Sequence, residues 1–248
     1  MWGIVPAAGN GTRIQPLAFS KELLPVGSRG DGAADRPRAV SEYLLERMVI
    51  AGAEKICFVI SPWKSDILRY YGGGYGRANL AYAIQSEARG LCDAIFRALP
   101  VVPPDEPVLI GLPDTIWFPD DALAALPDDR LSLLLFPVNQ PELFDAVLTD
   151  GNGKVQAIEV KASAPRSSWI WGALKLPPGA LASLHALWRQ RERRDEYLGT
   201  LITAWIGSGG EAWGVRAGTS YVDVGTLHGY REAMRLLASP EATRTAVA

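Results

Sequence analysis

Cysteine and histidine are scarce in this sequence. It contains two of each among 248 residues, and the two cysteines, Cys57 and Cys92, stand far apart without forming a CxxC pair. Two cysteines are too few for a disulfide framework, and no group of cysteines and histidines has the spacing of a zinc site. We therefore expect both thiols to be reduced and buried.

The chain also lacks a strong net charge and a long apolar run. Its formal net charge of −2 provides no broad positive field for a nucleic acid backbone, although it is compatible with a local basic pocket. The longest apolar run beyond the N-terminus, residues 131–138, is far shorter than the roughly 18 residues that span a bilayer. The opening MWGIVPAAGNG lacks the basic start and the length of a signal peptide. We expect a cytoplasmic protein whose main partner is neither nucleic acid nor a membrane.

The order of the apolar segments predicts the fold class. In the first two-thirds of the chain, we expect strands over residues 2–7, 55–61, 80–85, 108–112 and 131–138, and helices over residues 40–51, 64–71 and 90–99. Apolar runs separated by helices are typical of a largely parallel sheet that is covered on both faces. We therefore predict an α/β protein with a doubly wound, mostly parallel sheet, whose ligands bind beyond the carboxyl ends of the strands.

The second half of the chain has a different pattern. Residues 144–149 and 154–161 flank the turn sequence DGNG, which predicts an antiparallel hairpin. Further elements are expected as strands over residues 168–176 and 221–224 and as helices over residues 178–189 and 227–237. Because we find no linker or internal repeat, we expect one domain over residues 1–240 with an antiparallel excursion in its second half. Residues 241–248 are expected to form a frayed tail, and the Gly- and Asp-rich segment from Ser28 to Arg36 a loop.

A glycine-rich loop follows the first expected strand. The segment GNGTR, residues 9–13, combines two glycines, which let backbone amides approach a ligand closely, with the forked cation of Arg13. This combination suits a di- or triphosphate. The third glycine of a dinucleotide fingerprint is absent, because that position is Ile14, and so is the Gly-Lys-Ser/Thr of a P-loop. Considered alone, the two glycines are equally compatible with a simple turn.

A longer motif continues from this loop. Lys21 lies eight residues after Arg13, within the segment SKELLPVG. The whole run VPAAGNGTRIQPLAFSKELLPVG, residues 5–27, resembles the opening of the sugar-phosphate nucleotidyltransferase family, which includes glucose-1-phosphate thymidylyltransferases and UTP–glucose-1-phosphate uridylyltransferases. The resemblance implies a Rossmann-like nucleotidyltransferase fold, with Arg13 and Lys21 as catalytic cations. It also implies that the nucleotide is bound by Ala8, Gly9, Gly11, Thr12 and Arg13.

The resemblance extends to a segment that contacts the base in this family. Gln85, followed by Gly90 in Arg89-Gly90-Leu91, matches a glutamine that reads a pyrimidine edge and a glycine that lies close to the ring. These residues are also compatible with an ordinary strand end and helix start. The resemblance implies that Gln85 and Gly90 bind the base and that Asp114 belongs to the same nucleotide site.

Two aspartates match the metal ligands of the family. Asp114 follows the apolar run 108–112, and Asp223 lies in YVDVGT, residues 221–226. As isolated residues they would be interpreted as a turn aspartate and a helix cap. Nucleotidyl transfer brings two phosphate groups together, and Mg²⁺ held by carboxylates is the usual way to neutralise that charge. We therefore expect Asp114 and Asp223 to hold one Mg²⁺, although the family more often has Gly-Asp where this chain has Pro113-Asp114.

The similarity is weaker on the side of the sugar. Lys161 matches a lysine that binds the phosphate of the sugar 1-phosphate, and the segment adds Glu159 and Gly172 as sugar-phosphate-binding candidates. Glucose-specific members have a glutamate directly before this lysine, where this chain has Val160, and a glycine where it has Asp145. We therefore expect glucose 1-phosphate to be a poor substrate. Four tryptophans are dense in this half, and core packing is the expected role of most of them: Trp169, Trp171, Trp205 and Trp213.

Together these features predict a sugar-1-phosphate nucleotidyltransferase. The substrates would be a nucleoside triphosphate, with a pyrimidine base, and a sugar 1-phosphate that attacks the α-phosphorus and displaces pyrophosphate. No general base is required, because the attacking phosphate is already ionised. Two alternatives remain open: a cytidylyltransferase for a non-sugar phosphate such as phosphocholine, and an inactive homologue that binds nucleotide sugars and regulates a partner. An NAD-dependent dehydrogenase is disfavoured by Ile14. The sequence leaves the base, the sugar and any homo-oligomer undetermined.

Overall fold

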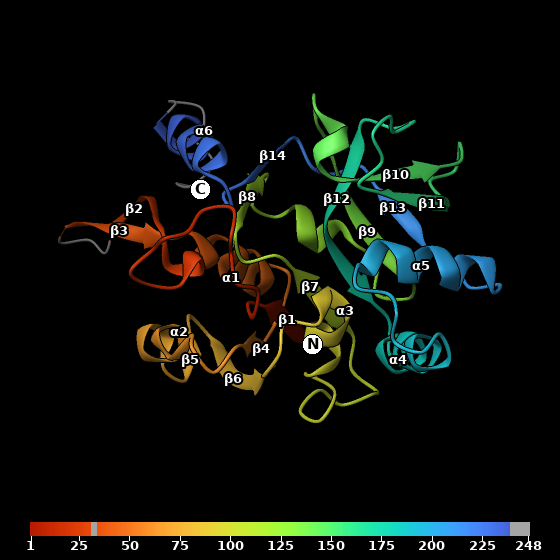
Figure 1. Ribbon diagram of the computed structural model, residues 1–248, viewed down its shortest axis with the longest axis horizontal. Coiled ribbons are helices and arrows are strands. Elements are labelled where there is room, and N and C mark those ends of the chain that lie inside the picture. Colours follow the sequence, from red (N-terminus) through yellow and green to blue (C-terminus); the bar gives the residue numbers. More distant parts are fainter. Residues whose placement is uncertain (31–33, 239–248) are drawn as a thin grey trace.

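A parallel sheet lies at the centre of the molecule (Figure 1). The computed structural model describes residues 1–30 and 34–238. The parallel part of the sheet is formed by four neighbouring strands, in the order β6 (Ala78–Ile84), β4 (Lys55–Ile60), β1 (Trp2–Pro6) and β7 (Val108–Gly111). Residues of β1 and β4 are almost completely buried, as expected for strands covered on both faces. The doubly wound, mostly parallel sheet predicted from the sequence is confirmed.

Helices cover both faces of this sheet. One face packs against α1 (Val40–Ile50) and α2 (Ser65–Tyr71), and the other packs against α3 (Gly90–Phe96), α4 (Ala180–Gln190) and α5 (Leu198–Gly207). In α1, Leu44, Leu45 and Met48 are fully buried. The connection through α3 crosses to the second face and leads to β7, on the other side of β1. This reversal between β1 and β7 creates the crevice in which doubly wound folds bind ligands.

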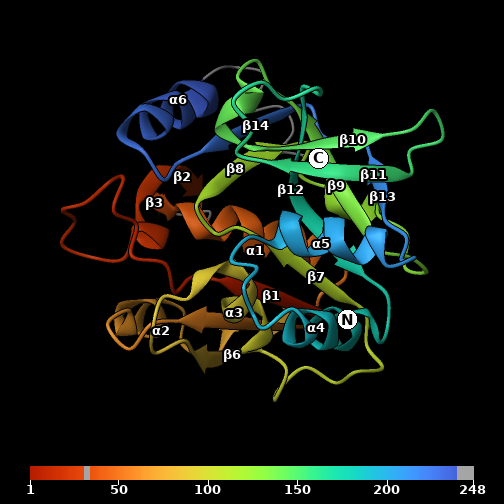
Figure 2. The ribbon, with the colours of Figure 1, turned by 45° about the vertical axis from the view of Figure 1, so that its right-hand side comes forward.

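The second half of the chain extends the sheet with antiparallel strands (Figure 2). β12 (Trp169–Leu176) pairs antiparallel with β7 and also with β10 (Asp145–Thr149), which forms a hairpin with β11 (Val155–Val160). The predicted antiparallel excursion is therefore confirmed. β9 (Ser132–Pro137), which lay in the section expected to be parallel, pairs antiparallel with β12 and parallel with β13 (Trp213–Val215).

A third hydrophobic cluster joins the two ends of the chain. α6 (Leu227–Ala238) packs over the hairpin of β2 (Pro25–Gly30) and β3 (Asp35–Ala39) and over the pair formed by β8 (Thr115–Phe118) and β14 (Ser220–Asp223). The prediction of a loop from Ser28 to Arg36 is wrong at both of its ends, because residues 28–30 and 35–36 form ladder pairs. The tail predicted at residues 241–248 lies outside the described residues.

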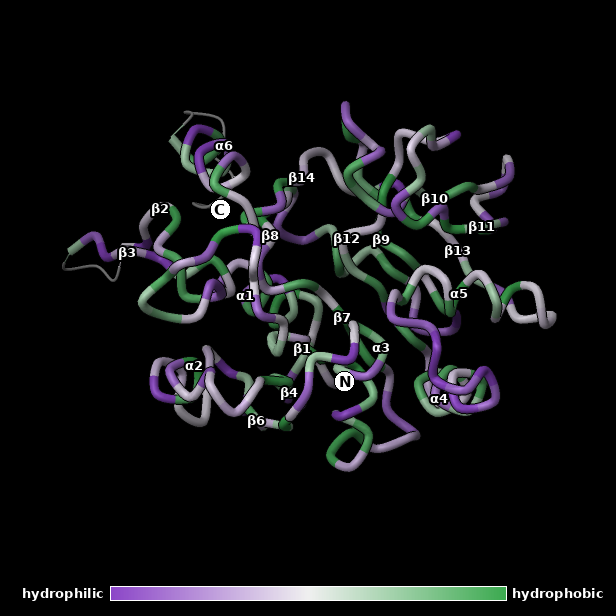
Figure 3. Tube along the Cα trace, in the orientation of Figure 1, coloured by the Kyte–Doolittle hydropathy of each residue, from purple (hydrophilic) through white to green (hydrophobic). Residues whose placement is uncertain are grey.

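The remaining elements are short. They are β5 (Gly74–Tyr75) and the 3-10 turns η1 (Lys21–Leu23), η2 (Ala122–Ala125) and η3 (Pro141–Leu143). Hydrophobic residues follow the central strands, and the outer loops are mostly hydrophilic (Figure 3). Cys57 and Cys92 are free and buried as predicted, and burial raises the pKa of each thiol to about 12. Within residues 1–30 and 34–238, no helix is long and apolar enough to cross a membrane.

Candidate active site

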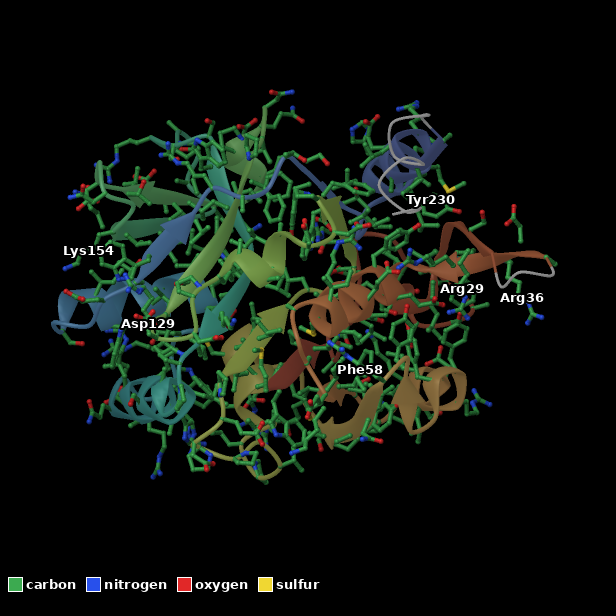
Figure 4. All side chains as sticks on the ribbon, turned by 180° about the vertical axis from the view of Figure 1, so that it is seen from behind. Arg29, Arg36, Phe58, Asp129, Lys154 and Tyr230 are labelled. Atoms are coloured by element: carbon green, nitrogen blue, oxygen red, sulfur yellow. The ribbon has the colours of Figure 1, made fainter. Side chains whose placement is uncertain are left out.

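A cavity of about 270 Å³ opens at the carboxyl ends of β1 and β7. Its lining brings together residues from both halves of the chain, including Gly9, Arg13, Lys21, Glu22, Asp114, Asp145, Lys161, Trp171, Tyr221 and Asp223. A larger cavity of about 1140 Å³ lies between the β2–β3 hairpin and α2. Its lining includes Arg29 (Figure 4), whose guanidinium is already paired with Glu42 at 2.8 Å. The smaller cavity contains Arg13, Lys21, Asp114, Lys161 and Asp223, which the sequence singled out, and it occupies the expected crevice.

The glycine loop forms one rim of this cavity. Gly9 and Arg13 line it, whereas Ala8 is buried beneath the loop and Thr12 is exposed. Gly11 has a φ of 65°, and a β-carbon at this position would lie 2.8 Å from Cδ of Lys21. Only glycine adopts this conformation readily and leaves the space through which the lysine side chain passes. Gly11 therefore directs Lys21 into the cavity.

Two ion pairs cross the floor of the cavity. Lys21 Nζ lies 2.5 Å from Asp114 Oδ2, and Arg13 Nη1 lies 2.9 Å from Asp223 Oδ2. Burial opposes the charges of both members of the Lys21–Asp114 pair. Even so, the attraction between them dominates, so the pKa of Asp114 is lowered and the pKa of Lys21 is raised. Lys21 and Asp114 are therefore both charged at neutral pH, and each cation of the two pairs lies close to a carboxylate.

Both ion pairs meet at Gly225, between β14 and α6. A β-carbon on this glycine would lie 2.8 Å from Asp223 Oδ1, 3.0 Å from Arg13 Nη2 and 3.1 Å from Asp114 Oδ2. Pairing of β8 with β14 positions the two aspartates, because Val224 N donates to Asp114 O at 2.8 Å. Two carboxylates directed at one point suit Mg²⁺, which takes one or two protein carboxylates and completes its shell with phosphate and water. No group of three or more potential metal ligands occurs in the described part of the chain.

Gln85 lies at the end of β6, outside the lining of this cavity. Its side chain is 3% exposed, and its amide nitrogen donates to Asp93 Oδ2 at 2.8 Å and to Gly90 O at 3.2 Å. Because both partners are acceptors, they fix the orientation of the amide. Gly90 thus contacts Gln85, and only the side-chain oxygen of Gln85 can accept a further hydrogen bond. The side chain of Gln85 can therefore offer a base an acceptor but no donor.

The three residues expected to bind the sugar phosphate do not all reach the cavity. Lys161 lines the cavity, has a left-handed φ of 49° and donates from Nζ to Leu143 O at 3.0 Å. Glu159 does not line the cavity, because its carboxylate accepts hydrogen bonds from Arg166 N at 2.8 Å and Arg166 Nε at 2.6 Å. Gly172 is buried beneath the rings of Phe136 and Tyr221. Of these three candidates, only Lys161 faces the site directly.

An aromatic wall closes the side of the cavity near Lys161. Phe144 packs edge-on against Tyr221 with ring centroids 5.7 Å apart, and Trp171 and Tyr197 complete the lining. Burial raises the pKa of Tyr221 well above its ordinary value, so its hydroxyl stays neutral. Of the four tryptophans noted in the sequence, Trp171 is the one that lines this cavity. This wall is suited to the carbon skeleton of a bound molecule.

The cavity therefore combines a cationic glycine loop, a paired-carboxylate floor and a separate lysine. Comparison with known families agrees with this geometry, since a nucleotidyl transferase model matches residues 2–239, which is nearly the whole chain. The chain belongs to the nucleotidyl transferase family. It is accordingly a nucleotidyltransferase enzyme.

Relatives of this nucleotidyl transferase carry related names. It is 27% identical over 237 residues to a glucose-1-phosphate thymidylyltransferase of Mycolicibacterium smegmatis, covering 92% of this chain and 78% of that protein. It is 26% identical over 233 residues to a UTP–glucose-1-phosphate uridylyltransferase of Haloferax volcanii, covering 91% of each. The UTP-bound UGPase of Acinetobacter baumannii has the same fold, with a TM-score of 0.75 at 20% identity over 99% of this chain and 98% of that one.

A buried ion pair supports the active site of this nucleotidyl transferase from behind. Lys64 Nζ lies 2.7 and 2.8 Å from the two carboxylate oxygens of Glu22, and it also donates to Ala7 O at 2.7 Å. Burial outweighs the attraction, so the pKa of Glu22 is raised and the pKa of Lys64 is lowered. Glu22 adjoins Lys21 in the chain, and Ala7 precedes the glycine loop. The pair therefore ties together both cationic segments.

We expect Lys64→Met to lower the free energy of unfolding by about 3–5 kcal/mol, because it leaves the Glu22 carboxylate buried without its partner. Urea denaturation measures this change. Lys154→Met is the matched control, because Lys154 pairs with Glu211 at the surface and the loss should be about 0–1 kcal/mol (Figure 4). If Lys64→Met unfolded at the same urea concentration as the unmodified protein, the Glu22–Lys64 pair would have no structural role.

Several residues of the site were not identified from the sequence. Glu22 and Lys64 act through partners that are distant in the chain, and no local pattern marks them. The aromatic wall could not be predicted from the sequence either, because tyrosine and phenylalanine are ordinary core residues. A weak signal did exist for Gly225, since it directly follows the Asp223-Val224 pair within the metal motif.

Proposed function

We propose that this enzyme transfers a nucleotidyl group from a pyrimidine nucleoside triphosphate to a sugar 1-phosphate, releasing pyrophosphate. One observation carries the proposal: Arg13, Lys21, Asp114 and Asp223 converge beside Lys161 in one cavity. Arg13 and Lys21 can bind a triphosphate, with the two aspartates available for its metal ion. Lys161 provides a separate cation for a second phosphate. The names of the relatives support the same pair of substrates.

Positioning and charge neutralisation account for the proposed mechanism. The triphosphate lies on the glycine loop, where backbone amides and Arg13 donate hydrogen bonds to its charged oxygens. Lys21 faces the phosphates that react. Asp114 and Asp223 would hold Mg²⁺, which supplies further neutralisation of the phosphates when bound. When the triphosphate pairs with Arg13 and Lys21, carboxylate oxygens of the two aspartates become free to bind the metal ion.

The acceptor approaches from the opposite side of the cavity. Lys161 binds its phosphate, and an oxygen of that phosphate forms the new bond to the α-phosphorus while the bond to pyrophosphate breaks. The phosphate is ionised at neutral pH, so no side chain needs to remove a proton. Holding both phosphates in line supplies much of the acceleration.

A pyrophosphate-release assay tests this proposal. The protein would be incubated with each of UTP, dTTP, CTP, ATP and GTP in combination with a panel of sugar 1-phosphates and with phosphocholine. Transfer to a sugar 1-phosphate supports the proposal, and transfer to phosphocholine alone supports the cytidylyltransferase alternative. Binding of a nucleotide sugar without pyrophosphate release from any pair would indicate an inactive, regulatory homologue.

We expect UTP or dTTP to be preferred over ATP and GTP. The oxygen of Gln85 is the group left to accept a hydrogen bond, and the ring N–H of uracil or thymine is a suitable donor. The contact should contribute about 0.5–1.5 kcal/mol. Ratios of kcat/KM across the triphosphates, in the unmodified enzyme and in Gln85→Leu, measure it. A preference for GTP would contradict the assignment of Gln85.

A further inference from the structure

An aspartate with an unpaired oxygen lies at the acceptor end of the cavity. Asp145 begins β10 and lines the cavity together with Lys161 and Trp171. Its Oδ1 atom is buried and forms no hydrogen bond among the described residues, and the same is true of the Trp171 indole nitrogen. Burial raises the pKa of the Asp145 carboxyl, against the lowering effects of Lys161 and Trp171 nearby. A buried carboxylate oxygen without a donor is costly.

No ion pair within the fold accounts for this carboxylate. Among residues 1–30 and 34–238, no cation lies within ion-pair distance of Asp145, and Lys161 directs its ammonium group to the carbonyl of Leu143. The Trp171 indole lies close enough to affect the pKa of Asp145, but no hydrogen bond of normal geometry joins the two. Hydrogen bonding from the Lys161 backbone also lowers the pKa of Asp145, so its carboxylate is partly compensated, and it borders the cavity beside Lys161 and Trp171.

Strand pairing places Asp145 beside Lys161 at the cavity. Asp145 and Val160 are directly opposite each other in the β10–β11 ladder, so their side chains lie on the same face of the sheet. Val160 packs against Gly199 at the start of α5, whereas Asp145 borders the cavity. Lys161 directly follows Val160 and lines the same cavity. A molecule whose phosphate is bound by Lys161 therefore lies close to Asp145.

We propose that Asp145 selects the acceptor by accepting a hydrogen bond from a hydroxyl or amino group at its organic end, while Trp171 packs against the carbon skeleton. This inference rests on the proposed function. A ring hydroxyl of a sugar phosphate and the amino group of an aminated phosphate share the required chemistry, which is an O–H or N–H donor. An acceptor without a donor leaves the carboxylate unpaired, and sites built around a hydrogen bond discriminate strongly against such ligands.

The test compares acceptors and variants by kcat/KM. The acceptors are glucose 1-phosphate, galactose 1-phosphate, glucosamine 1-phosphate, phosphoethanolamine and phosphocholine, and the last of these has no O–H or N–H at its organic end. We expect the best acceptor to carry a donor, and Asp145→Ala to lower its kcat/KM by about 10- to 100-fold without changing KM for the triphosphate. Asp145→Asn distinguishes the two sources. Its amide oxygen still serves a neutral hydroxyl, so activity falls less, whereas an ammonium-bearing acceptor loses as much as in Asp145→Ala.

Stability provides a second readout that separates selection from support of the fold. Since Asp145→Asn removes a buried charge that Lys161 and Trp171 compensate only in part, we expect this variant to melt at a higher temperature than the unmodified enzyme while using its acceptor less well. A merely structural residue would lower both quantities. Asp129→Asn is the matched control: Asp129 lies at the surface, paired only with its neighbour Arg130, and neither quantity should change (Figure 4).

An unchanged ranking of acceptors in Asp145→Ala would overturn this inference while leaving the proposed function intact. Phosphocholine as the best acceptor of the unmodified enzyme would overturn this inference and also count against a sugar 1-phosphate as the acceptor. If the unmodified enzyme released pyrophosphate from no pair of substrates, the proposed function itself would fail. The two failures are therefore distinguishable in the same assay.

Discussion

Asp223→Asn is expected to lower turnover by a factor on the order of 10²–10³ and to leave the melting temperature nearly unchanged. Asp223 is partly exposed, and its partner Arg13 is largely exposed, so the lost ion pair contributes little to stability. The lost carboxylate oxygen would be a ligand of Mg²⁺ beside the reacting phosphates. Pyrophosphate release over a range of Mg²⁺ concentrations measures the effect, and the concentration required for half-maximal rate should rise.

Asp114→Asn should lower turnover to a similar degree but also lower stability. Asp114 is buried, and its removal leaves the charge of Lys21 without its closest partner. Comparing the melting temperatures of the two variants separates the ion-pair role from the metal role. Asp129→Asn is the control for replacing an aspartate by asparagine, because Asp129 is exposed and paired with Arg130. Near-normal rates of both variants in the presence of EDTA would refute the assignment of the metal to these aspartates.

The strands and helices that the sequence predicted correctly have strong periodic or apolar patterns. β1 and β4 are continuous apolar runs, and α1 presents Leu44, Leu45 and Met48 on one face. The elements that were missed have no such pattern. β5 and β13 have two and three residues, too few for a period, and α5 is apolar on nearly all sides because it packs between β11 and α4. The direction of β9 depends on its partner β12, which its own residues do not specify.

The charged residues of the candidate site were predicted from the resemblance to the nucleotidyltransferase family. Arg13 and Asp223 are 210 residues apart, and that resemblance is what links them in the sequence. Other features of the site depend on contacts that form only in the folded protein. Glu159 was a candidate because it lies near Lys161, but its pairing with Arg166 removes it from the cavity. The strand register that sets Asp145 opposite Val160 likewise depends on the folded hairpin.

Gly225→Ala is the substitution that should affect activity most for its size. The added methyl group would lie within 2.8–3.1 Å of Asp223 Oδ1, Arg13 Nη2 and Asp114 Oδ2, closer than carbon normally approaches these atoms. All three belong to the ends of flexible side chains, so they can move aside at little cost to the fold. In the proposed mechanism they are also the atoms that meet phosphate and metal, and small displacements of positioned groups reduce rates by about 10²-fold.

We therefore expect Gly225→Ala to lower kcat by roughly 100-fold while the melting temperature changes little. The backbone of Gly225 is not in the left-handed region, so alanine introduces no conformational strain there. Gly207→Ala is the control, since Gly207 ends α5, has ordinary φ and has open space around its α-carbon. Pyrophosphate release and thermal unfolding of both variants decide the outcome. Full activity of Gly225→Ala would mean that the two ion pairs do not converge on the reacting phosphates, and both the metal site and the proposed arrangement of the triphosphate would have to be abandoned.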